Sequence, residues 1–375
     1  MAKIYYSIAG EGRGHATRAR AVIEGLRQNH EIIIYTSDLA LELLRPMYEG
    51  TEVQVREIPG LGFKYSASKK LDYVGTGLGS LSYIANLPAL IRRHQADIEA
   101  EKPDLIITDF EPSMPRAARR CGVPFLSLDH QHVLAASDLS SLPFRLRCYG
   151  VLMGLFVRLY YRNQIHTVVS SFYFPPIKSS FKNVTQIGVL LRDEIQNAPT
   201  TVGDHVVAYL RRFTTREVLE ALAGCGREVR IYGLGERPDE GNLRFKKIDV
   251  HGFIDDLATS QALISTAGNQ LVGEALYLGK PVLAMPEDGN HEQEINAHFL
   301  RESGAGIAVA TRAMTPEIVR DFLDRREEFV ARIDRSRLCG NQAACEAVER
   351  HLDGDYQHGV LALPKTRRKA PPVNV

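Results

Sequence analysis

The sequence is poor in cysteine, and neither sign of charge is in excess. Its 375 residues include five cysteines, an odd number, scattered without a CxxC pair. Such a set does not build a disulfide framework and is typical of reduced thiols in a cytoplasmic protein. Lys and Arg together number 46 and Asp and Glu 45, so no overall field favours a nucleic-acid partner. The cysteines are Cys121, Cys148, Cys225, Cys339 and Cys345.

Long apolar runs are also lacking. No stretch approaches the roughly 20 apolar residues that cross a bilayer, and the first ten residues run directly into glycine, so neither a transmembrane helix nor a signal peptide is predicted. The nearest approach is CYGVLMGLFV at 148–157, which lies between Arg145 and Arg147 on one side and Arg158 and Arg162 on the other. We expect a buried helix with arginines at its ends. Contact with an anionic membrane surface is the alternative.

The N-terminal half alternates short β-rich runs with stretches whose apolar residues have helical spacing. Strands that alternate with helices indicate parallel βαβ units. Strands are predicted at 3–10, 30–37, 103–110 and 123–132, and helices at 15–28, 38–50 and 112–122.

The same alternation begins again after residue 200. Strands are predicted at 204–210, 227–235, 262–268 and 280–286, and helices at 214–226, 269–279 and 291–304. The length of the chain also favours two domains. We predict an α/β protein with two Rossmann-like domains that face each other across a cleft. Its parts are an N-terminal domain at 1–166, a linker at 167–187, a C-terminal domain at 188–353 and a flexible tail at 354–375.

A glycine and two amides follow the predicted strand at 262–268. Gly268, Asn269 and Gln270 begin a helix, where free amide groups and the positive end of the helix dipole form an anion site. Glu274 lies further along this helix, where its carboxylate could accept hydrogen bonds from a ribose diol. An ordinary glycine turn with a surface glutamate is the alternative.

Polar residues follow the next strand as well. His291 and Glu294 form an HxxE pair, but no third ligand is evident, so no metal site is predicted. Gln293 lies at the same helix start, and we expect it at the same edge of the sheet as Gly268. Upstream, Phe253 and Ile254 are expected in a strand-like turn whose backbone groups recognise the edge of a base.

The block GFIDDLATSQALISTAGNQLVGEALYLGKPVLAMP, followed by EQEINA, resembles the donor half of the GT-B glycosyltransferases, which consist of two Rossmann domains. It is most similar to the group that adds N-acetylglucosamine to the lipid-linked peptidoglycan precursor, and to soluble relatives of that group. The resemblance implies ribose contacts for Glu274, diphosphate contacts for Gly268, Asn269 and Gln270, donor-sugar contacts for Gln293 beside His291, and main-chain contacts to uracil for Phe253 and Ile254.

Two further stretches bear on this resemblance. GVLLR, at 188–192, has the spacing of a family element whose arginine approaches phosphate, which implicates Arg192. After the strand at 204–210 the family often has a glycine- and serine-rich phosphate loop, whereas this chain has YLRRFTTRE. Arg211 and Arg212 are the residues here that could take the place of that loop.

The opening strand runs into GEGRGHATR, at 10–18. Gly12 and Gly14 keep the loop thin, and His15 at the helix start could accept a proton from an attacking hydroxyl, since the ordinary pKa of histidine is near 6.5. The family pattern of glycines followed by histidine matches His15. Arg18 is expected to face the diphosphate, and Asp109 to orient His15.

Other residues could serve as the base. Asp109 ranks second and His130 third, because LDHQH at 128–132 ends the next strand. A histidine that only hydrogen-bonds its own loop is the remaining interpretation of His15.

The predicted activity is inverting, metal-independent transfer of a sugar from a nucleotide-diphospho-sugar, UDP-linked, to an unknown hydroxyl acceptor, either lipid-linked or a small molecule. No cofactor is expected. GRGHATR also fits nucleotide-sugar hydrolases of the same fold, in which the histidine activates water. Segments 62–80 and 134–162 are long enough to build an acceptor groove, which favours transfer. A nucleotide-sugar-binding protein without turnover is the third alternative.

Overall fold

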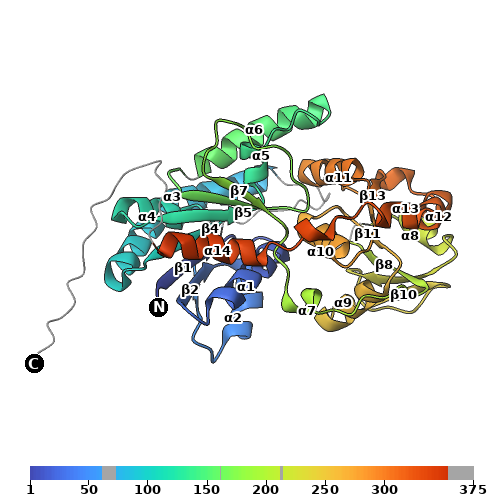
Figure 1. Cartoon of the computed structure of the whole chain (residues 1–375), viewed down its shortest axis with the longest axis horizontal. Coiled ribbons are helices and arrows are strands. Elements are labelled where there is room, and N and C mark those ends of the chain that lie inside the picture. Colours follow the sequence, from blue (N-terminus) through green and yellow to red (C-terminus); the bar gives the residue numbers. More distant parts are fainter. Residues whose placement is uncertain (61–72, 161, 212–213, 354–375) are drawn as a thin grey trace, which may run out of the picture.

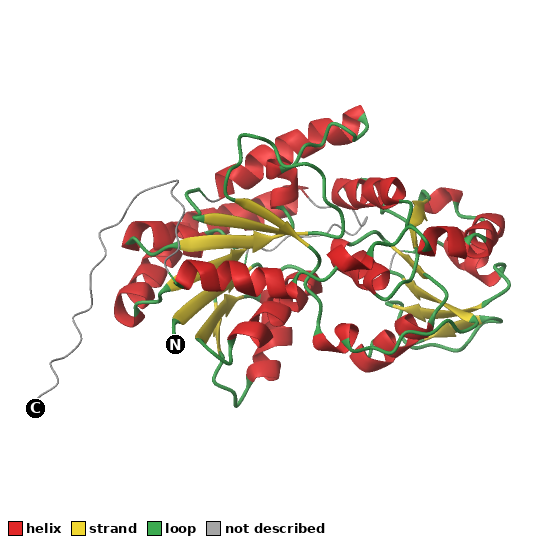
Figure 2. Cartoon of the chain, viewed as in Figure 1, coloured by secondary structure: helices red, strands yellow, loops and turns green. Residues whose placement is uncertain are grey.

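The fold consists of two parallel β-sheets, each covered by helices on both faces (Figures 1 and 2). It is known from a computed structural model, which describes residues 1–60, 73–160, 162–211 and 214–353. The predicted flexible tail at 354–375 lies outside the described residues. So do Arg212 and most of the predicted acceptor segment at 62–80, of which only 73–80, at the start of a helix, are described.

The first sheet has seven strands in the order β3-β2-β1-β4-β5-β6-β7. All its neighbouring pairs are parallel, so the carboxyl ends of the strands lie at one edge. The strands are β1 (Lys3–Ile8), β2 (Glu31–Thr36), β3 (Gln54–Glu57), β4 (Leu105–Asp109), β5 (Phe125–Asp129), β6 (His166–Ser170) and β7 (Val184–Ile187).

Alternation along the buried strands divides the core of the first domain into two layers. In β1, Ile4, Tyr6 and Ile8 pack on one face, while Tyr5 packs on the other. The first layer contacts α1 (Arg13–Leu26), α2 (Asp38–Tyr48) and α14 (Asn341–Leu352). The second contacts α3 (Tyr73–Glu101) and α4 (Ser113–Cys121). Two further helices, α5 (His132–Ala136) and α6 (Phe144–Tyr160), lie beside β6 and β7.

The second sheet has six parallel strands in the order β10-β9-β8-β11-β12-β13. Its strands are β8 (His205–Tyr209), β9 (Glu228–Tyr232), β10 (Leu243–Phe245), β11 (Leu263–Ser265), β12 (Val282–Ala284) and β13 (Gly306–Ala308). Its helices are α7 (Asp193–Gln196), α8 (Arg216–Ala223), α9 (Val250–Thr259), α10 (Asn269–Tyr277), α11 (His291–Ser303), α12 (Pro316–Asp324) and α13 (Arg326–Val330), with 3₁₀ turns at Thr311–Ala313 and Arg335–Arg337.

The domain boundaries differ from the predicted ones in two places. The predicted linker at 167–187 contributes the rest of β6 and all of β7 to the first sheet. The last helix, α14, leaves the second domain and packs on α1, where Ala344, Ala347 and Val348 join the first core. Proline and serine between β6 and β7 obscured these strands, and no local pattern specifies on which domain a terminal helix will dock.

The chain passes between the domains twice, and the two passages lie side by side. Gly340 N–H donates to the Val189 carbonyl at 2.9 Å. A Cβ added to Gly188 would lie 2.5 Å from the Leu338 backbone, and one added to Gly340 would lie 2.3 Å from the Gly188 carbonyl oxygen. Only glycine permits this close crossing, which fixes α14 against the first domain.

The expected burial of 148–157 is wrong for part of the segment. Val151, Leu152, Leu155 and Phe156 of α6 are exposed. Among the described helices, none has both the length and the apolar character needed to traverse a bilayer.

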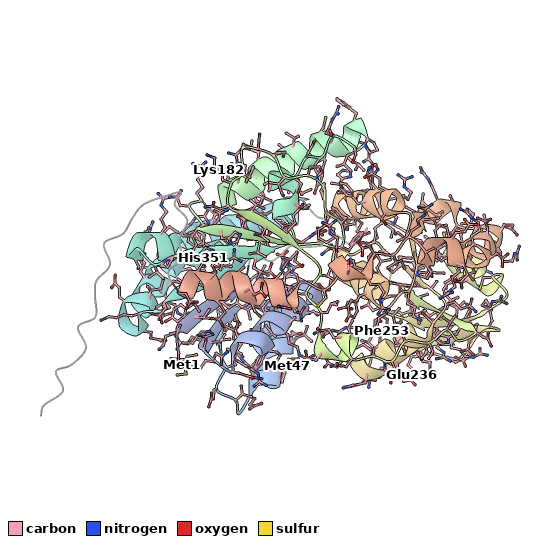
Figure 3. The ribbon with its side chains drawn as sticks, in the orientation of Figure 1. Met1, Met47, Lys182, Glu236, Phe253 and His351 are labelled. Atoms are coloured by element: carbon pink, nitrogen blue, oxygen red, sulfur yellow. The ribbon has the colours of Figure 1, made fainter. Side chains whose placement is uncertain are left out.

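The contact between α14 and β6 brings two histidines together. Nδ1 of His166 lies 3.0 Å from Nε2 of His351, which Figure 3 labels on α14. Burial, together with the neighbouring His351 and Arg350, lowers the pKa of His166 to about 4, and burial lowers the pKa of His351 as well. Because folding depresses both pKa values below 6.5, the unfolded chain takes up protons first as the pH falls.

We therefore expect the free energy of unfolding to fall as the pH drops from 6.5 toward 4, by at most about 1.4 kcal/mol per pH unit for each histidine. Urea unfolding across this range measures the effect. His166→Gln should flatten the decline, whereas His251→Gln, at an exposed position, should keep the wild-type slope. Equal slopes for the two variants would contradict this account.

Candidate functional site

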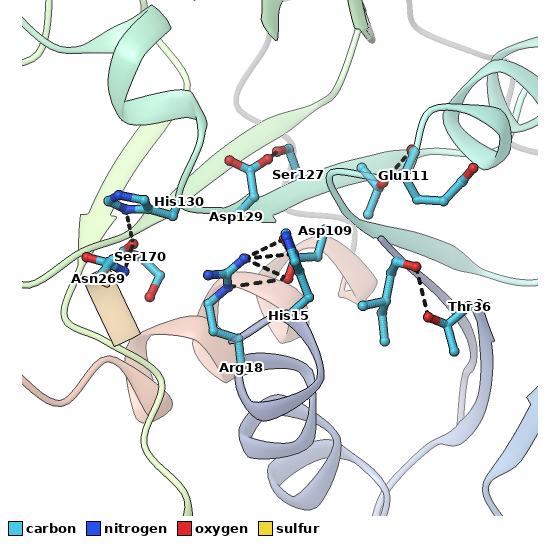
Figure 4. A network of polar contacts seen from close by, with 12 residues as sticks. His15, Arg18, Thr36, Asp109, Glu111, Ser127, Asp129, His130, Ser170 and Asn269 are labelled. Atoms are coloured by element: carbon cyan, nitrogen blue, oxygen red, sulfur yellow. Dashed lines mark hydrogen bonds and ion pairs between the residues drawn. The ribbon is translucent and has the colours of Figure 1, made fainter. Parts of the chain in front are cut away.

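The carboxyl ends of four neighbouring strands of the first sheet carry most of the polar residues of the site (Figure 4). The loop after β1 leads into α1 and His15. Asp109 ends β4, Asp129 ends β5, and Ser170 ends β6. Since these strands are adjacent in the order β1-β4-β5-β6, the sheet itself brings residues far apart in sequence to one edge.

His15, Arg18 and Asp109 form a compact cluster at this edge (Figure 4). Nδ1 of His15 lies 3.0 Å from Oδ1 of Asp109. Arg18 donates from Nη2 to both carboxylate oxygens, at 2.9 and 3.1 Å, and from Nε to Oδ2 at 3.3 Å. The Asp109 side chain is fully buried, whereas that of His15 is 13% exposed. His15 is therefore the member of the cluster that a ligand can reach.

Asp109 stabilises the charge of Arg18 and orients the side chains of the cluster. Burial by itself would lower the pKa of Arg18, but the charge and hydrogen bonds of Asp109 outweigh it and raise that pKa. Nη2 of Arg18 also lies 2.9 Å from Nδ1 of His15. We assign the His15 proton to Nδ1, because a buried carboxylate is the stronger partner for that nitrogen. Nε2 then carries the free lone pair.

The side chain of Arg18 does not make the predicted contact. It was expected to face a diphosphate, but its side chain is buried and its guanidinium is directed at Asp109. The physical reason is the cost of burying a carboxylate without a counter-charge. Arg18 is thus a positioning residue for Asp109 and His15.

The glycines before His15 keep the backbone open. Gly12 has φ 81° and precedes α1 at its N-cap, a conformation that favours glycine. A Cβ added at Gly12 or Gly14 would meet nothing within 4 Å, so packing does not demand glycine at position 14. Phe110, directly after Asp109, also has a positive φ, 55°. Backbone strain of this kind gathers at functional sites.

The start of α10 has the features of an anion site. Gly268 is its N-cap and Gly12 is that of α1, and no side chain in the described part of the chain caps either helix. By contrast, Asp249 caps α9 and Asn290 caps α11. First-turn amides lack intrahelical acceptors, so two uncapped helices offer donors to a bound anion. The preceding Ala267 has φ 46°, a strained value for a residue with a Cβ.

The start of α10 lies against the same edge of the first sheet as His15. Oδ1 of Asn269 accepts from Ser171 Oγ and from the Phe172 amide, both at 3.3 Å, and its Nδ2 donates to the Ser170 carbonyl at 3.4 Å. Nδ1 of His130 donates to the same carbonyl at 3.0 Å. The two predicted halves of the site are therefore neighbours, as Figure 4 shows. Because the Asn269 side chain makes these contacts, the backbone amides at the start of α10 are the groups that remain to donate to an anion.

Glu274 is buried beside the passage between the domains. Nη2 of Arg192 lies 3.3 Å from its Oε2, and Nε2 of Gln270 donates to its Oε1 at 3.0 Å. Gln270 also donates to the Leu190 carbonyl at 2.8 Å. Nε of Arg192 and Oε1 of Gln270 are buried without a hydrogen-bond partner among the described residues. Unsatisfied buried polar atoms of this kind are rare and mark a place where a ligand can bind.

Phe253 and Ile254 do not lie in the predicted strand-like turn. Both are buried in α9, where Phe253 packs against Tyr209 and Tyr232. The Phe253 amide donates to the Asp249 carbonyl at 2.9 Å and is thus taken by the helix. Apolar residues at three- and four-residue spacing bury a helix face here, and they outweigh the local turn signal.

The loop that begins α11 is held by its own side chains. Gln293 accepts from the Glu287 amide at 2.8 Å and donates to the Glu287 carboxylate at 3.0 Å. Nδ1 of His291 lies 3.4 Å from Glu294, and Arg145 of α6 contacts both residues. In the described part of the chain, no three His, Cys, Asp or Glu side chains cluster closely enough to hold a metal ion.

A second carboxylate–histidine pair follows β5. Oδ2 of Asp129 lies 2.8 Å from Nδ1 of His132 and accepts from Ser127 Oγ at 2.5 Å. Burial would raise the pKa of Asp129, but the charge and hydrogen bonds of His132 lower it overall. His132 is 1% exposed and His130 2%. Burial also lowers the pKa of His130, and His15 is more exposed than either of these histidines.

The contacts that hold the two domains together include residues that were not predicted as functional. Tyr173 donates to Asn296 at 3.0 Å and stacks on Phe299 with ring centroids 4.2 Å apart. Arg20 of α1 donates to Glu194 at 2.7 Å. The run SSFY, at 170–173, begins at the last residue of β6 and was the available signal for a contact surface.

Comparison with known proteins agrees with this architecture. A sequence model described as "Glycosyl transferase family 1" matches residues 2–326. A protein of Methanosarcina mazei named "Uncharacterized glycosyltransferase" is 25% identical over 383 residues, covering 93% of this chain and 98% of its own length.

A shorter match concerns a Burkholderia thailandensis protein named UDP-N-acetylglucosamine--N-acetylmuramyl-(pentapeptide) pyrophosphoryl-undecaprenol N-acetylglucosamine transferase. It is 32% identical over 111 residues, 28% of this chain and 30% of that protein. Among solved structures, Medicago truncatula UGT71G1 in complex with UDP-glucose superposes with a TM-score of 0.67 at 14% identity, covering 94% of this chain and 98% of that one. The latter likeness concerns the fold alone.

The Asp109 cluster leads to a prediction about stability. Asp109→Asn removes the counter-charge of a buried guanidinium, so we expect the free energy of unfolding to fall by about 3–5 kcal/mol. Asp204→Asn, at an exposed position, should change it by less than about 0.5 kcal/mol. Adding Arg18→Met to Asp109→Asn should restore part of the loss, since no buried charge is then unpaired. Urea unfolding would contradict this account if the loss of unfolding free energy in the double variant equalled the sum of the losses in the two single variants.

Proposed function

The chain belongs to glycosyl transferase family 1 and is a glycosyltransferase with the GT-B fold. From this premise we propose that it moves a sugar from a nucleotide-diphospho-sugar, UDP-linked, to a hydroxyl acceptor, with inversion at the anomeric carbon and without a metal ion. The observation that carries the proposal is the contact between His15 and the buried Asp109 at the strand edge where α10 also begins.

His15 acts as the general base. Its Nε2 takes the proton from the acceptor hydroxyl while the hydroxyl oxygen bonds to the anomeric carbon and the bond from that carbon to the diphosphate breaks. Asp109 holds the proton on Nδ1 and stabilises the imidazolium that forms, as a buried carboxylate does for a catalytic histidine. One displacement from the face opposite the leaving group inverts the configuration.

Fixed positive groups balance the charge of the leaving diphosphate. The uncapped starts of α1 and α10 present amide donors and the positive ends of two helix dipoles. Arg192, whose Nε has no hydrogen-bond partner among the described residues, lies beside α10 through its contact with Glu274. These groups supply the stabilisation that a cation provides in other transferases, which supports a metal-independent reaction.

Glu274 recognises the ribose. A carboxylate accepts hydrogen bonds from both hydroxyls of a diol, and Gln270 and Arg192 already hold this one in place. UDP as the nucleotide is supported by the UDP-glucose complex of the structural neighbour and by the UDP-N-acetylglucosamine in the name of the Burkholderia relative. Phe253 and Ile254 are buried, and the Phe253 amide donates to Asp249, so this proposal includes no main-chain contact from Phe253 to the base.

UDP release tests the reaction. The protein is incubated with UDP-glucose or UDP-N-acetylglucosamine, with and without a panel of hydroxyl acceptors. We expect UDP release that depends on the acceptor. Equal release without acceptor would indicate a hydrolase. Tight binding of the sugar nucleotide without any UDP release would indicate a sensor. His15→Ala should lower turnover by about 10²–10⁴-fold, the usual contribution of a general base.

The same assay has a matched control. His30 lies at the opposite end of the strands, before β2, where it contacts Glu349, so His30→Ala should keep wild-type turnover. Calorimetry should give UDP affinities within about threefold for His15→Ala and wild type, since a base contributes to the transition state rather than to nucleotide binding. A loss of affinity equal to the loss of turnover would make His15 a binding group.

Glu274→Gln tests ribose recognition. We expect UDP binding to weaken by about 1–3 kcal/mol, the range for a hydrogen bond to a charged group. Wild type should prefer UDP to 2′,3′-dideoxy-UDP, and the variant should bind both alike, as measured by calorimetry. Glu220→Gln on the exposed side of α8 should keep the wild-type preference. A preference that survives in Glu274→Gln would remove this residue from the ribose contact.

A further inference from the structure

Helix α6 presents an apolar face to solvent. Its exposed side carries large apolar residues along its whole length and no acidic residue. Leu152 is 65% exposed and Leu155 53%, values that a single exposed leucine can reach but that a continuous row rarely does. The row consists of Phe144, Val151, Leu152, Leu155, Phe156 and Leu159. In Figure 1, α6 stands out at the top of the molecule.

The buried side of α6 explains why these residues point outward. Gly150 and Gly154 lie against the α5 segment, and a Cβ at Gly154 would lie 2.5 Å from the Leu134 carbonyl oxygen. The two glycines therefore fix which side of the helix faces the protein. The large side chains are left on the other side, so the exposed row is a consequence of tight packing elsewhere and not of a loosely placed helix.

The stretch of sequence that contains α6 has charge of one sign, and Glu294 of α11 pairs with Arg145 at the first end of the helix. From Leu139 to Arg192 the sequence contains no Asp or Glu, in a chain that otherwise has nearly equal numbers of both signs. The same stretch contains Arg145, Arg147, Arg158, Arg162, Lys178, Lys182 and Arg192. Lys182 is labelled beside α6 in Figure 3.

A pocket joins the apolar face to these cations. It has a volume of about 470 Å³ and lies at the C-terminal end of α6, where Leu155 and Leu159 line it together with Arg158 and Arg162. Arg158 lies over the ring of Phe181, 5.6 Å from its centroid. Apolar side chains next to fixed guanidinium groups suit a molecule with an anionic head and an apolar body.

We propose that α6 docks the protein on an anionic lipid surface, with the apolar row inserted at the headgroup boundary and the flanking cations against lipid phosphates. An interfacial helix combines these two features, an apolar side and basic flanks. The first end of α6 contacts the start of α11 through Arg145 and through Tyr149, whose ring lies 4.6 Å from that of His291. Docking therefore brings the second domain close to the lipid surface as well.

Charge also argues against a second copy of the chain as the occupant. Two α6 helices paired antiparallel about a twofold axis would place Arg145 and Arg147 of one against Arg158 and Arg162 of the other. Such like-charge contacts across an interface oppose association. An anionic bilayer has the complementary charge and does not require a shape-matched groove.

Vesicle sedimentation of the full chain, without any sugar nucleotide, tests the proposal independently of the catalytic assignment. We expect binding to phosphatidylglycerol–phosphatidylcholine vesicles and at least tenfold weaker binding to phosphatidylcholine alone. Leu152→Glu with Leu155→Glu should reduce binding at least tenfold. Arg158→Gln with Lys182→Gln should reduce it by about 25-fold, since each cation near an anionic surface contributes about fivefold.

Val202→Glu provides the matched control, because Val202 is 57% exposed and lies in the second domain away from α6. It should bind vesicles like wild type, and all variants should keep the wild-type unfolding midpoint. Absence of binding to anionic vesicles, or equal binding by the Leu152/Leu155 variant, would overturn the proposal. It would also be overturned by a wild-type dimer in size-exclusion chromatography that this variant abolishes without any vesicle binding, since the face would then be a protein interface.

Discussion

The buried carboxylate of Asp109 is the constraint on which the N-terminal half of the site depends. An anion with no exposed surface needs a counter-charge and hydrogen bonds, and Arg18 supplies both. His15 then contacts the same carboxylate through Nδ1, which orients its ring. Because β1 and β4 are neighbours in the sheet, one pairing of strands brings the three residues together. His15 is therefore positioned by the core of the domain rather than by its loop.

The second half of the site depends on how the two domains meet. Asn269 ties the start of α10 to the end of β6, and Arg192 and Gln270 surround Glu274 where the chain crosses between the domains. These polar contacts are accompanied by apolar packing, because Tyr173 stacks on Phe299 and buried residues of both domains form one cluster. The return of α14 to the first domain adds a further constraint, because Gly188 and Gly340 hold the two crossings together.

Tight packing of one helix accounts for the apolar surface of the first domain. Gly150 and Gly154 seat α6 tightly on α5 and leave its large apolar side chains in solvent, next to a stretch of sequence without acidic residues. A helix selected only for folding would carry charged residues on that side. The exposed face of α6 and the strand edge with His15 are thus two separate features of one domain, the first suited to a lipid surface and the second to chemistry.

Local pattern alone determined the fold class, since buried strands alternating with helices specify parallel sheets, and glycines after strands mark the turns that precede α1 and α10. It also indicated His15, Asp109, Gly268 and Glu274, because strand ends of a parallel sheet share one edge. Tertiary structure alone decided the role of Arg18, the helical burial of Phe253, the place of α14 and the exposure of α6. Each of these depends on a partner distant in sequence: a buried charge to neutralise, a core to fill, or a helix to pack against. Spacing along the chain contains no information about such partners.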